Sequence, residues 1–205
     1  MKRAEDPFCE VCRAMLVKIE GPRCEVCSRS MKAEGVCGDC EVWSKHPEFK
    51  GVLTSNQSIY QYNPALKELL KRFKYSGDYV LAGCFQKELT ELVKPFMKSA
   101  IIIPLPVSAE RLKERGFNQT EALLDCAMIK YECLLTRENT ETSQAKKVKS
   151  ERHKGENPFK AIRNLTGEKI ILIDDLYTTG TTLRRAAHVL KKAGAGEIRT
   201  LTVGR

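Results

Sequence analysis

Long hydrophobic runs are missing from this sequence. The longest mostly apolar stretch, residues 100–107, is far shorter than the roughly 20 residues that a transmembrane helix needs. The first nine residues contain acidic side chains and lack the apolar segment of a secretory signal. We therefore expect a cytoplasmic protein with neither a membrane span nor an export signal.

Two common nucleotide-binding patterns are also absent. The sequence has no Gly-Lys-Ser/Thr of a P-loop and no GxGxxG, which argues against a P-loop nucleoside triphosphatase and against a Rossmann dinucleotide site. Histidine is scarce, and His46, His153 and His188 are too dispersed to predict a catalytic cluster. The remaining composition, 42% apolar and 30% charged over 205 residues, is typical of a globular domain with a small appendage.

Positive charge is concentrated in one part of the chain. Residues 1–50 contain nine Lys/Arg and nine Asp/Glu, whereas residues 51–205 contain 26 and 17, so the second part carries the whole net charge of +9. A basic domain suits a polyanion such as nucleic acid, or a small substrate rich in phosphate. A solvated basic surface without a partner is the alternative.

The nine cysteines form two groups. Six make CxxC pairs within the first 40 residues, and Cys84, Cys126 and Cys133 stand alone in apolar stretches. Without an export signal, thiolate pairs on zinc are favoured over disulfides. A tetrahedral site needs two CxxC turns. The nine residues between the second and third pairs predict a zinc ribbon with four ligands: Cys24, Cys27, Cys37 and Cys40.

The first pair, Cys9 and Cys12, leaves three interpretations open. It could complete a site with the second pair, form an unfilled half-site, or bind metal together with cysteines of another chain. A thioredoxin-like redox function is disfavoured, because no βαβ unit surrounds these cysteines. The cysteine-rich segment has few large apolar residues, so a bound metal is expected to take the place of a hydrophobic core. Trp43 is expected to pack the ribbon on the neighbouring part of the protein.

After residue 50 the sequence alternates between predicted strands and helices. Strands are predicted at 58–62, 100–103, 131–135 and 170–173. Helices are predicted at 63–74 and 78–97, from Asn118 or Thr120 to 128, and from the threonine-rich turn at 178–182 to 193, with Ser108 capping a short basic turn. This order predicts an α/β fold with a mainly parallel sheet flanked by helices. Residues 138–158 lack apolar periodicity and predict a long, mobile, cationic loop, either a lid or plain disorder.

The stretch from residue 169 to 183 joins a buried strand to a threonine-rich turn. Asp174 and Asp175 end the aliphatic strand, where their carboxylates could accept hydrogen bonds from the hydroxyls of a ribose. Free backbone amides at a helix start, together with hydroxyls, can surround a phosphate. The turn supplies them from Thr178, Thr179, Gly180, Thr181 and Thr182. The pattern predicts ribose 5-phosphate binding; two acids that merely cap the next helix are the alternative.

This turn resembles the phosphoribosyl diphosphate (PRPP) loop of type I phosphoribosyltransferases, here IILIDDLYTTGTT at residues 170–182. Segments along nearly the whole chain resemble the ComF family of late competence proteins: CGDCEVW at 37–43, LLKRFKYSGD at 69–78, IIPLPVS at 102–108, RLKERGFNQ at 111–119 and SQAKK at 143–147. The resemblance implies a zinc ribbon at residues 1–50 and a type I phosphoribosyltransferase fold at residues 51–205.

The resemblance also implies roles for individual residues. Asp174 and Asp175 would hold the ribose diol, and residues 178–182 the 5-phosphate. Residues 104–107, with Leu105, would lie near the diphosphate, which Mg²⁺ would bridge to the ribose oxygens. Cations would stabilise the leaving diphosphate, namely Arg111, Arg115, Lys146 or Lys147. Thr178 stands where purine-salvage enzymes have an aspartate, so hypoxanthine-like salvage is not expected, and the acceptor stays open.

Membership of this family implies a role in natural transformation. Single-stranded DNA would then be one partner and a helicase-like ATPase another. Aromatic residues interleave with cations at residues 72–79, although Phe73 could equally belong to the core. The predicted DNA-binding cations are Arg72, Lys74, Lys146, Lys147, Lys149 and Arg152. A PRPP sensor without catalysis is a third interpretation.

Two departures from the family pattern stand out. Relatives carry three or four CxxC pairs, so the half-ribbon at Cys9 leads us to expect that an earlier pair is missing. Relatives also have an asparagine three residues after the loop arginine, whereas Gly155 follows Arg152 here.

Overall fold

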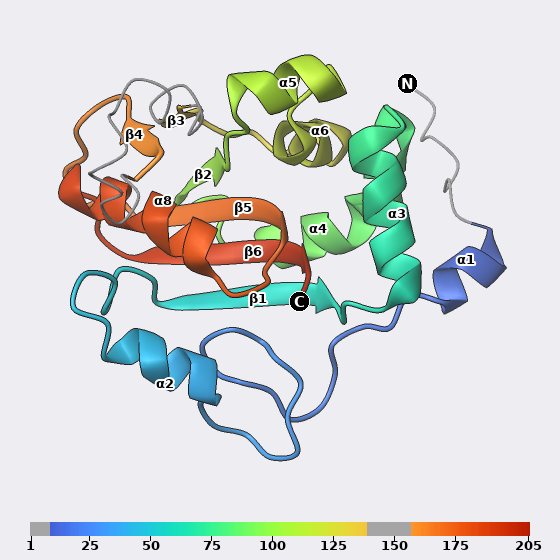
Figure 1. Cartoon of the computed structure of the whole chain (residues 1–205), viewed down its shortest axis with the longest axis horizontal. Helices are drawn as coiled ribbons and strands as arrows, with labels where there is room; N and C mark the ends of the chain where they lie inside the picture. The colour runs from blue at the N-terminus through green and yellow to red at the C-terminus, as the bar shows by residue number, and fades with distance from the viewer. Residues whose placement is uncertain (1–8, 139–156) are drawn as a thin grey trace, which may run out of the picture.

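A four-stranded parallel sheet forms the centre of the computed structural model, which describes residues 9–138 and 157–205 (Figure 1). The strand order is β1–β6–β5–β2, with β1 at Ser55–Tyr60, β2 at Ile101–Pro104, β5 at Ile170–Leu176 and β6 at Ile198–Gly204. A separate antiparallel pair joins β3 (Leu135–Arg137) to β4 (Phe159–Ala161). The predicted parallel sheet flanked by helices is confirmed.

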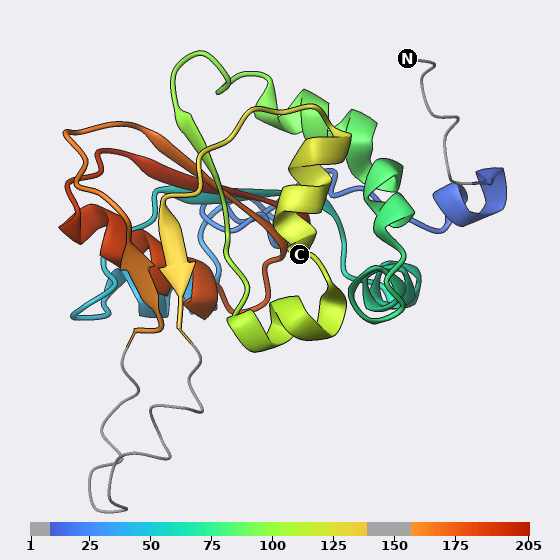
Figure 2. The same ribbon diagram turned by 90° about the horizontal axis from the view of Figure 1, so that it is seen from above.

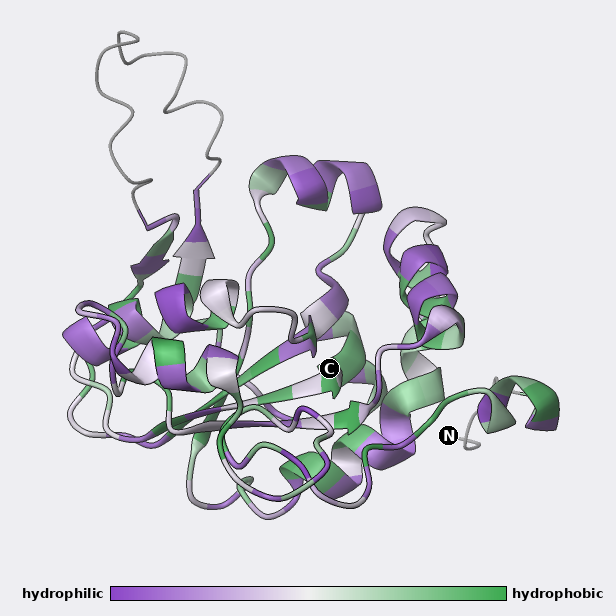
Figure 3. Cartoon of the chain, turned by 60° about the horizontal axis from the view of Figure 1, so that its bottom comes forward, coloured by the Kyte–Doolittle hydropathy of each residue, from purple (hydrophilic) through white to green (hydrophobic). Residues whose placement is uncertain are grey.

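Strand β5 is buried on both faces, and each face has its own core. Ile170 and Leu172 pack with α8 (Thr181–Lys192), while Ile171 and Ile173 pack with α4 (Gln86–Val93) and α6 (Gln119–Cys126). Figure 2 shows α8 and α4 on opposite sides of the sheet, and Figure 3 shows both hydrophobic and hydrophilic stretches along its strands. A continuous aliphatic strand is what a doubly covered parallel sheet requires.

The remaining helices are α1 (Glu10–Ala14), α2 (Gly38–Ser44), α3 (Pro64–Tyr75), the 3₁₀ helix η1 (Tyr79–Phe85) and α5 (Ala109–Arg115). Helix α3 follows its predicted boundaries and α5 is the predicted short basic turn, whereas α1 and α2 were not predicted. Asn63 caps α3 by accepting a hydrogen bond from the Leu66 amide at 2.8 Å, and Ser108 caps α5. Both caps are as predicted.

Three predicted elements differ in the structure. The strand predicted at 58–62 is β1, which begins earlier and ends at Tyr60. The single helix predicted at 78–97 is instead η1 followed by α4, which ends before Pro95, since proline disfavours helix at the residue before it. The strand predicted at 131–135 begins only at Leu135, because the pairing partner of β3 is β4, across the sequence gap. Strands β4 and β6 were not predicted. The predicted loop at 138–158 lies almost wholly outside the described residues.

The cysteine-rich segment lies along the edge strand β1 (Figure 1). The Ile19 amide donates to the Ile59 carbonyl at 2.9 Å, and the Gln61 amide donates to the Val17 carbonyl at 2.8 Å. Four cysteines share one hydrophobic cluster with Leu53, which leads into β1, and with residues of β5 and α8. The segments before and after residue 50 therefore have a common core.

None of the helices in the described part of the chain combines the length and apolar character that crossing a bilayer requires.

Candidate functional site

Two buried carboxylates lie near the carboxyl end of β5. Asp174 is 8% exposed and Asp175 is 3% exposed, and the Asp175 amide donates to Asp174 Oδ1 at 2.8 Å. Burial raises the pKa of Asp174 well above its usual range, and the adjacent charge of Asp175 raises it further. A cation or hydroxyl donors at the site would stabilise the charged carboxylate and offset this rise of the pKa.

Lys74, at the end of α3, forms an ion pair with Asp175. This lysine was predicted as a DNA contact, which stays a prediction; in the structure it lies against the carboxylate pair. The two residues before Lys74 also have partners within the protein. Phe73 is fully buried in the core, and Arg72 pairs with Asp78 at 3.0 Å. The segment 72–74 is therefore not a row of free cations.

The threonine-rich turn connects β5 to α8. Thr178 and Thr179 are exposed, and the hydroxyls of Thr179 and Thr181 lie 2.9 Å apart at the start of the helix, where Thr182 follows. Gly180 has φ of +78°, and a Cβ there would lie 2.2 Å from both Tyr177 Oη and Arg184 Nη1. Only glycine fits this position. The turn presents hydroxyls and a helix N-terminus, the groups that bind phosphate.

The end of β2 lies beside the carboxylate pair. The Leu105 amide donates to the Ile173 carbonyl at 2.9 Å, and the Asn118 side chain donates to the Leu105 carbonyl at 3.3 Å. Because the strands are parallel, residues 104–107 lie at the same edge of the sheet as the carboxylates. The structure thus brings together three of the predicted segments.

Several arginines act on this edge of the sheet. Burial lowers the pKa of Arg137, the like charge of the other arginines lowers it further, and Asp174 raises it. The set consists of Arg111, Arg115, Arg137 and Arg185. Within residues 9–138 and 157–205, no carboxylate forms an ion pair with any of the four. Such uncompensated positive charge suits a polyanionic ligand.

Arg115 is the clearest case of a positive charge without a paired carboxylate among the described residues, since it is only 9% exposed. One of its terminal nitrogens donates to Gln119 Oε1 at 2.8 Å, and its guanidinium lies 5.2 Å from the centre of the Tyr75 ring. Its buried Nε has no hydrogen-bond partner among the described residues. Sequence analysis named Arg111 and Arg115 but missed Arg137 and Arg185. A signal for Arg137 existed, because it ends a strand immediately before a cation-rich segment. The cations Lys146, Lys147, Lys149 and Arg152 lie outside the described residues.

The four predicted zinc ligands converge. The sulfurs of Cys24, Cys27, Cys37 and Cys40 all lie within 4.8 Å of one another and are buried. Zn–S bonds of about 2.3 Å in a tetrahedron separate the sulfurs by about 3.8 Å. The 3.6 Å between the Cys27 and Cys37 sulfurs matches this spacing. The chemistry and geometry of the cluster therefore fit a structural zinc ion.

Cys9 and Cys12 lie apart from this cluster. Both are exposed, and the Cys12 amide donates to Cys9 Sγ at 3.4 Å. The second CxxC pair shares its site with the third, so the first pair does not complete that site. The other two interpretations of Cys9 and Cys12, a half-site or ligands shared with another chain, stay open.

The ribbon contacts the threonine-rich turn directly. Trp43 Nε1 donates to the Thr179 carbonyl at 3.0 Å, and Arg184 stacks on the Trp43 ring at 4.7 Å. The predicted role of Trp43 in packing the ribbon on its neighbour is confirmed.

Comparison with known proteins agrees with this architecture. A model of the phosphoribosyl transferase domain matches residues 134–204, and one of the double zinc ribbon domain matches residues 1–41. Competence protein ComFC of Bacillus subtilis (strain 168) is 39% identical over 98% of this chain and 85% of its own length. Competence protein ComFC of Streptococcus pneumoniae (strain ATCC BAA-255 / R6) is 33% identical over 100% and 90%.

A more distant relative is DNA utilization protein YhgH of Escherichia coli (strain K12), with 24% identity over 93% of both chains. The ribbon, the parallel sheet and the two ComFC relatives lead to one conclusion: this chain belongs to the ComFC family.

Proposed function

We propose that this chain binds PRPP with Mg²⁺ at the carboxyl end of β5. One observation carries the proposal: the buried pair Asp174 and Asp175 leads directly into the turn at residues 178–182, which opens α8. The phosphoribosyl transferase domain match over residues 134–204 supports it. A diol acceptor pair next to a phosphate cradle corresponds to the two ends of a ribose 5-phosphate.

Different residues around the carboxylate pair bind different parts of the ligand. The carboxylates of Asp174 and Asp175 accept hydrogen bonds from the ribose hydroxyls, and the turn holds the 5-phosphate. The arginine set, including Arg115 and Arg137, faces the diphosphate. When bound, Mg²⁺ would neutralise part of the negative charge of the diphosphate.

If transfer occurs, the bond between the ribose C1 and the diphosphate oxygen breaks, and C1 bonds to an acceptor nucleophile. The arginines stabilise the negative charge that develops on the leaving diphosphate. No side chain of the protein needs to act as a nucleophile. A PRPP sensor would use the same contacts without this step.

Calorimetric titration with PRPP and Mg²⁺ tests the binding site. Replacing Asp174 and Asp175 together by Asn should weaken binding at least about tenfold, because hydrogen bonds to a charged group contribute about 1.5–3 kcal/mol. Asp78→Asn is the matched control, since this carboxylate pairs with Arg72 at the end of α3. An unchanged affinity in the folded double variant would place the site elsewhere.

Diphosphate release separates an enzyme from a sensor. A chain that binds PRPP and releases diphosphate when an acceptor is supplied is a transferase. Tight PRPP binding without release, in the presence and absence of single-stranded DNA, indicates a sensor.

We further propose that the chain acts on single-stranded DNA during natural transformation, together with a helicase-like ATPase. Two relatives are competence proteins and a third is a DNA utilization protein. The chain offers a stacking surface for a base, since Tyr75 is 69% exposed and lies against the cation Arg115. The net charge of +9 favours a polyanion.

A further inference from the structure

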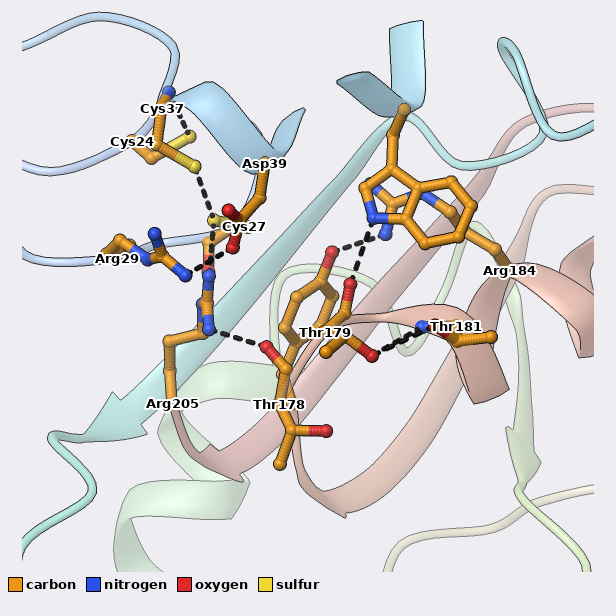
Figure 4. A network of polar contacts seen from close by, with 12 residues as sticks. Cys24, Cys27, Arg29, Cys37, Asp39, Thr178, Thr179, Thr181, Arg184 and Arg205 are labelled. Carbon is orange, nitrogen blue, oxygen red and sulfur yellow. Dashed lines mark hydrogen bonds and ion pairs between the residues drawn. The ribbon is translucent and has the colours of Figure 1, made fainter. Parts of the chain in front are cut away.

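Arg205 connects the cysteine cluster to the threonine-rich turn (Figure 4). Its guanidinium donates to Cys27 Sγ at 3.1 Å, to the Cys27 carbonyl at 3.1 Å and to the Thr178 carbonyl at 2.7 Å. The same group lies 4.8 Å from the centre of the Tyr177 ring. One rigid side chain thus joins a predicted zinc ligand to the turn that follows β5.

Trp43 makes a second connection from the ribbon. It belongs to α2, the helix that also carries the ligand Cys40. Its Nε1 donates to the Thr179 carbonyl, and Arg184 fixes the ring by stacking on it while donating to the Tyr177 hydroxyl. Two consecutive carbonyls of the turn, those of Thr178 and Thr179, are therefore both held by residues that the metal site positions.

The direction of these carbonyls determines the direction of the amides beside them. A peptide unit is planar, and in the trans form its C=O and N–H point in opposite directions. No cis peptide occurs in the described part of the chain. Holding the Thr178 and Thr179 carbonyls toward the ribbon therefore turns the amides of Thr179 and Gly180 away from it.

Those two amides are available for a ligand. Among the described residues, none accepts a hydrogen bond from the backbone N–H of Thr179 or Gly180. Consecutive free amides beside a helix start form an anion-binding concavity. Their orientation depends on contacts with the ribbon rather than on hydrogen bonds within the turn.

We propose that Arg205 and Trp43 are positioning residues, through which the zinc ribbon orients the phosphate-binding amides of Thr179 and Gly180. Zinc and the phosphorylated ligand then strengthen each other's binding. A zinc-bound sulfur would keep its negative charge and its position and would so hold the guanidinium in place, and a metal-free ribbon would hold it less firmly. The inference rests on the proposed PRPP site, because it concerns the same turn.

Paired titrations of the full chain test the inference. PRPP affinity is measured by calorimetry with Mg²⁺, and zinc affinity by competition with a chelator that does not bind magnesium, with and without saturating PRPP. By thermodynamic linkage, zinc and PRPP must tighten each other's binding by the same factor, expected to be about fivefold or more.

Three variants identify the residues responsible. Arg205→Met should reduce the effect of PRPP on zinc affinity and weaken PRPP binding about fivefold or more. Trp43→Phe keeps an aromatic ring but loses the donor, so it should weaken PRPP binding and leave zinc affinity without PRPP unchanged. Arg29→Gln is the matched control. Arg29 is a ribbon cation that pairs with Asp39, and its loss should leave the linkage factor intact.

The possible outcomes separate a failure of the proposed function from a failure of the inference alone. If the wild type does not bind PRPP, the proposed function fails and this inference fails with it. If the wild type binds PRPP but PRPP does not change its zinc affinity, only the inference fails. The same holds if both Arg205→Met and Trp43→Phe retain the wild-type linkage factor. Circular dichroism checks that each variant is folded. If Arg205→Met does not fold, Trp43→Phe alone tests the inference.

Discussion

At the scale of single residues, burial of Asp174 lowers the stability of the folded chain but provides a carboxylate for the proposed ligand. Burial raises its pKa in the folded chain, whereas in the unfolded chain it titrates near 4. The folded state therefore binds more protons between these two values, and this residue's contribution to stability is lost as the pH rises through them. Asp174→Asn should stabilise the chain at pH 7 by about 0.5–2 kcal/mol and weaken PRPP binding. Urea denaturation measures the gain.

The pH dependence of this effect is its control. Below about pH 3 the Asp174 carboxyl is protonated in both states, so the variant and the wild type should have nearly equal stability. A variant that is no more stable than the wild type at pH 7 would show that burial does not disfavour the carboxylate.

At the scale of elements, α3 is stabilised by the cap residue Asn63 before its first turn and carries Lys74 in its last turn. Asn63 accepts from the Leu66 amide, and its side-chain amide donates to the Met15 carbonyl at 2.8 Å, which ties α3 to the ribbon segment. Asn63→Ala should cost about 0.5–2 kcal/mol of unfolding free energy. Urea denaturation measures the loss. Ser44→Ala, which removes only a hydrogen bond to the Glu41 carbonyl, should change stability by less than about 0.5 kcal/mol.

A second consequence concerns Lys74, at the far end of α3. Because Lys74 pairs with Asp175, fraying of the helix should also loosen this contact. Equal stabilities of Asn63→Ala and the wild type would contradict the role of the cap.

At the scale of the whole molecule, charge separates two uses of the basic part. Four thiolates on one zinc ion carry a net charge of about −2, so the filled ribbon is slightly acidic and the excess positive charge belongs to residues 51–205. DNA affinity should fall with salt, with a logarithmic slope of about −0.7 per neutralised phosphate. Replacing Lys146, Lys147 and Lys149 by Gln should flatten that slope by about two units, as measured by fluorescence anisotropy.

The opposite result has a distinct meaning. If these lysines cover bound PRPP instead, the same variant should lose PRPP affinity and keep its DNA affinity. DNA binding that is weak at low salt and indifferent to the substitutions would remove this segment from the DNA proposal.

The errors of the sequence analysis have physical causes. The predicted helix at 78–97 contains Gly83 and Pro95, which weaken and end a helix, yet its apolar residues are spaced as in one. Strand β6 alternates polar and apolar side chains only over residues 200–203, a short run that the sequence analysis missed. Strand β4 has only three residues, too few for a periodic pattern.

The sequence by itself determined whatever depends on neighbouring residues: the cap at Asn63, the buried run of β5, the glycine that the turn requires at Gly180, and the CxxC spacing. Each of these is a local preference of the backbone or of a ligand set. Together they predicted the fold class, the four zinc ligands and the carboxylates beside the turn.

Only the tertiary structure decided which distant groups meet. Arg205 and Cys27 are 178 residues apart in sequence, and Trp43 and Thr179 are 136 apart. Lys74 reaches Asp175, and Arg137 joins the arginines of α5, because the parallel sheet gathers chain segments at one edge. No local pattern encodes such contacts, since they depend on strand order and on how the ribbon packs against β1.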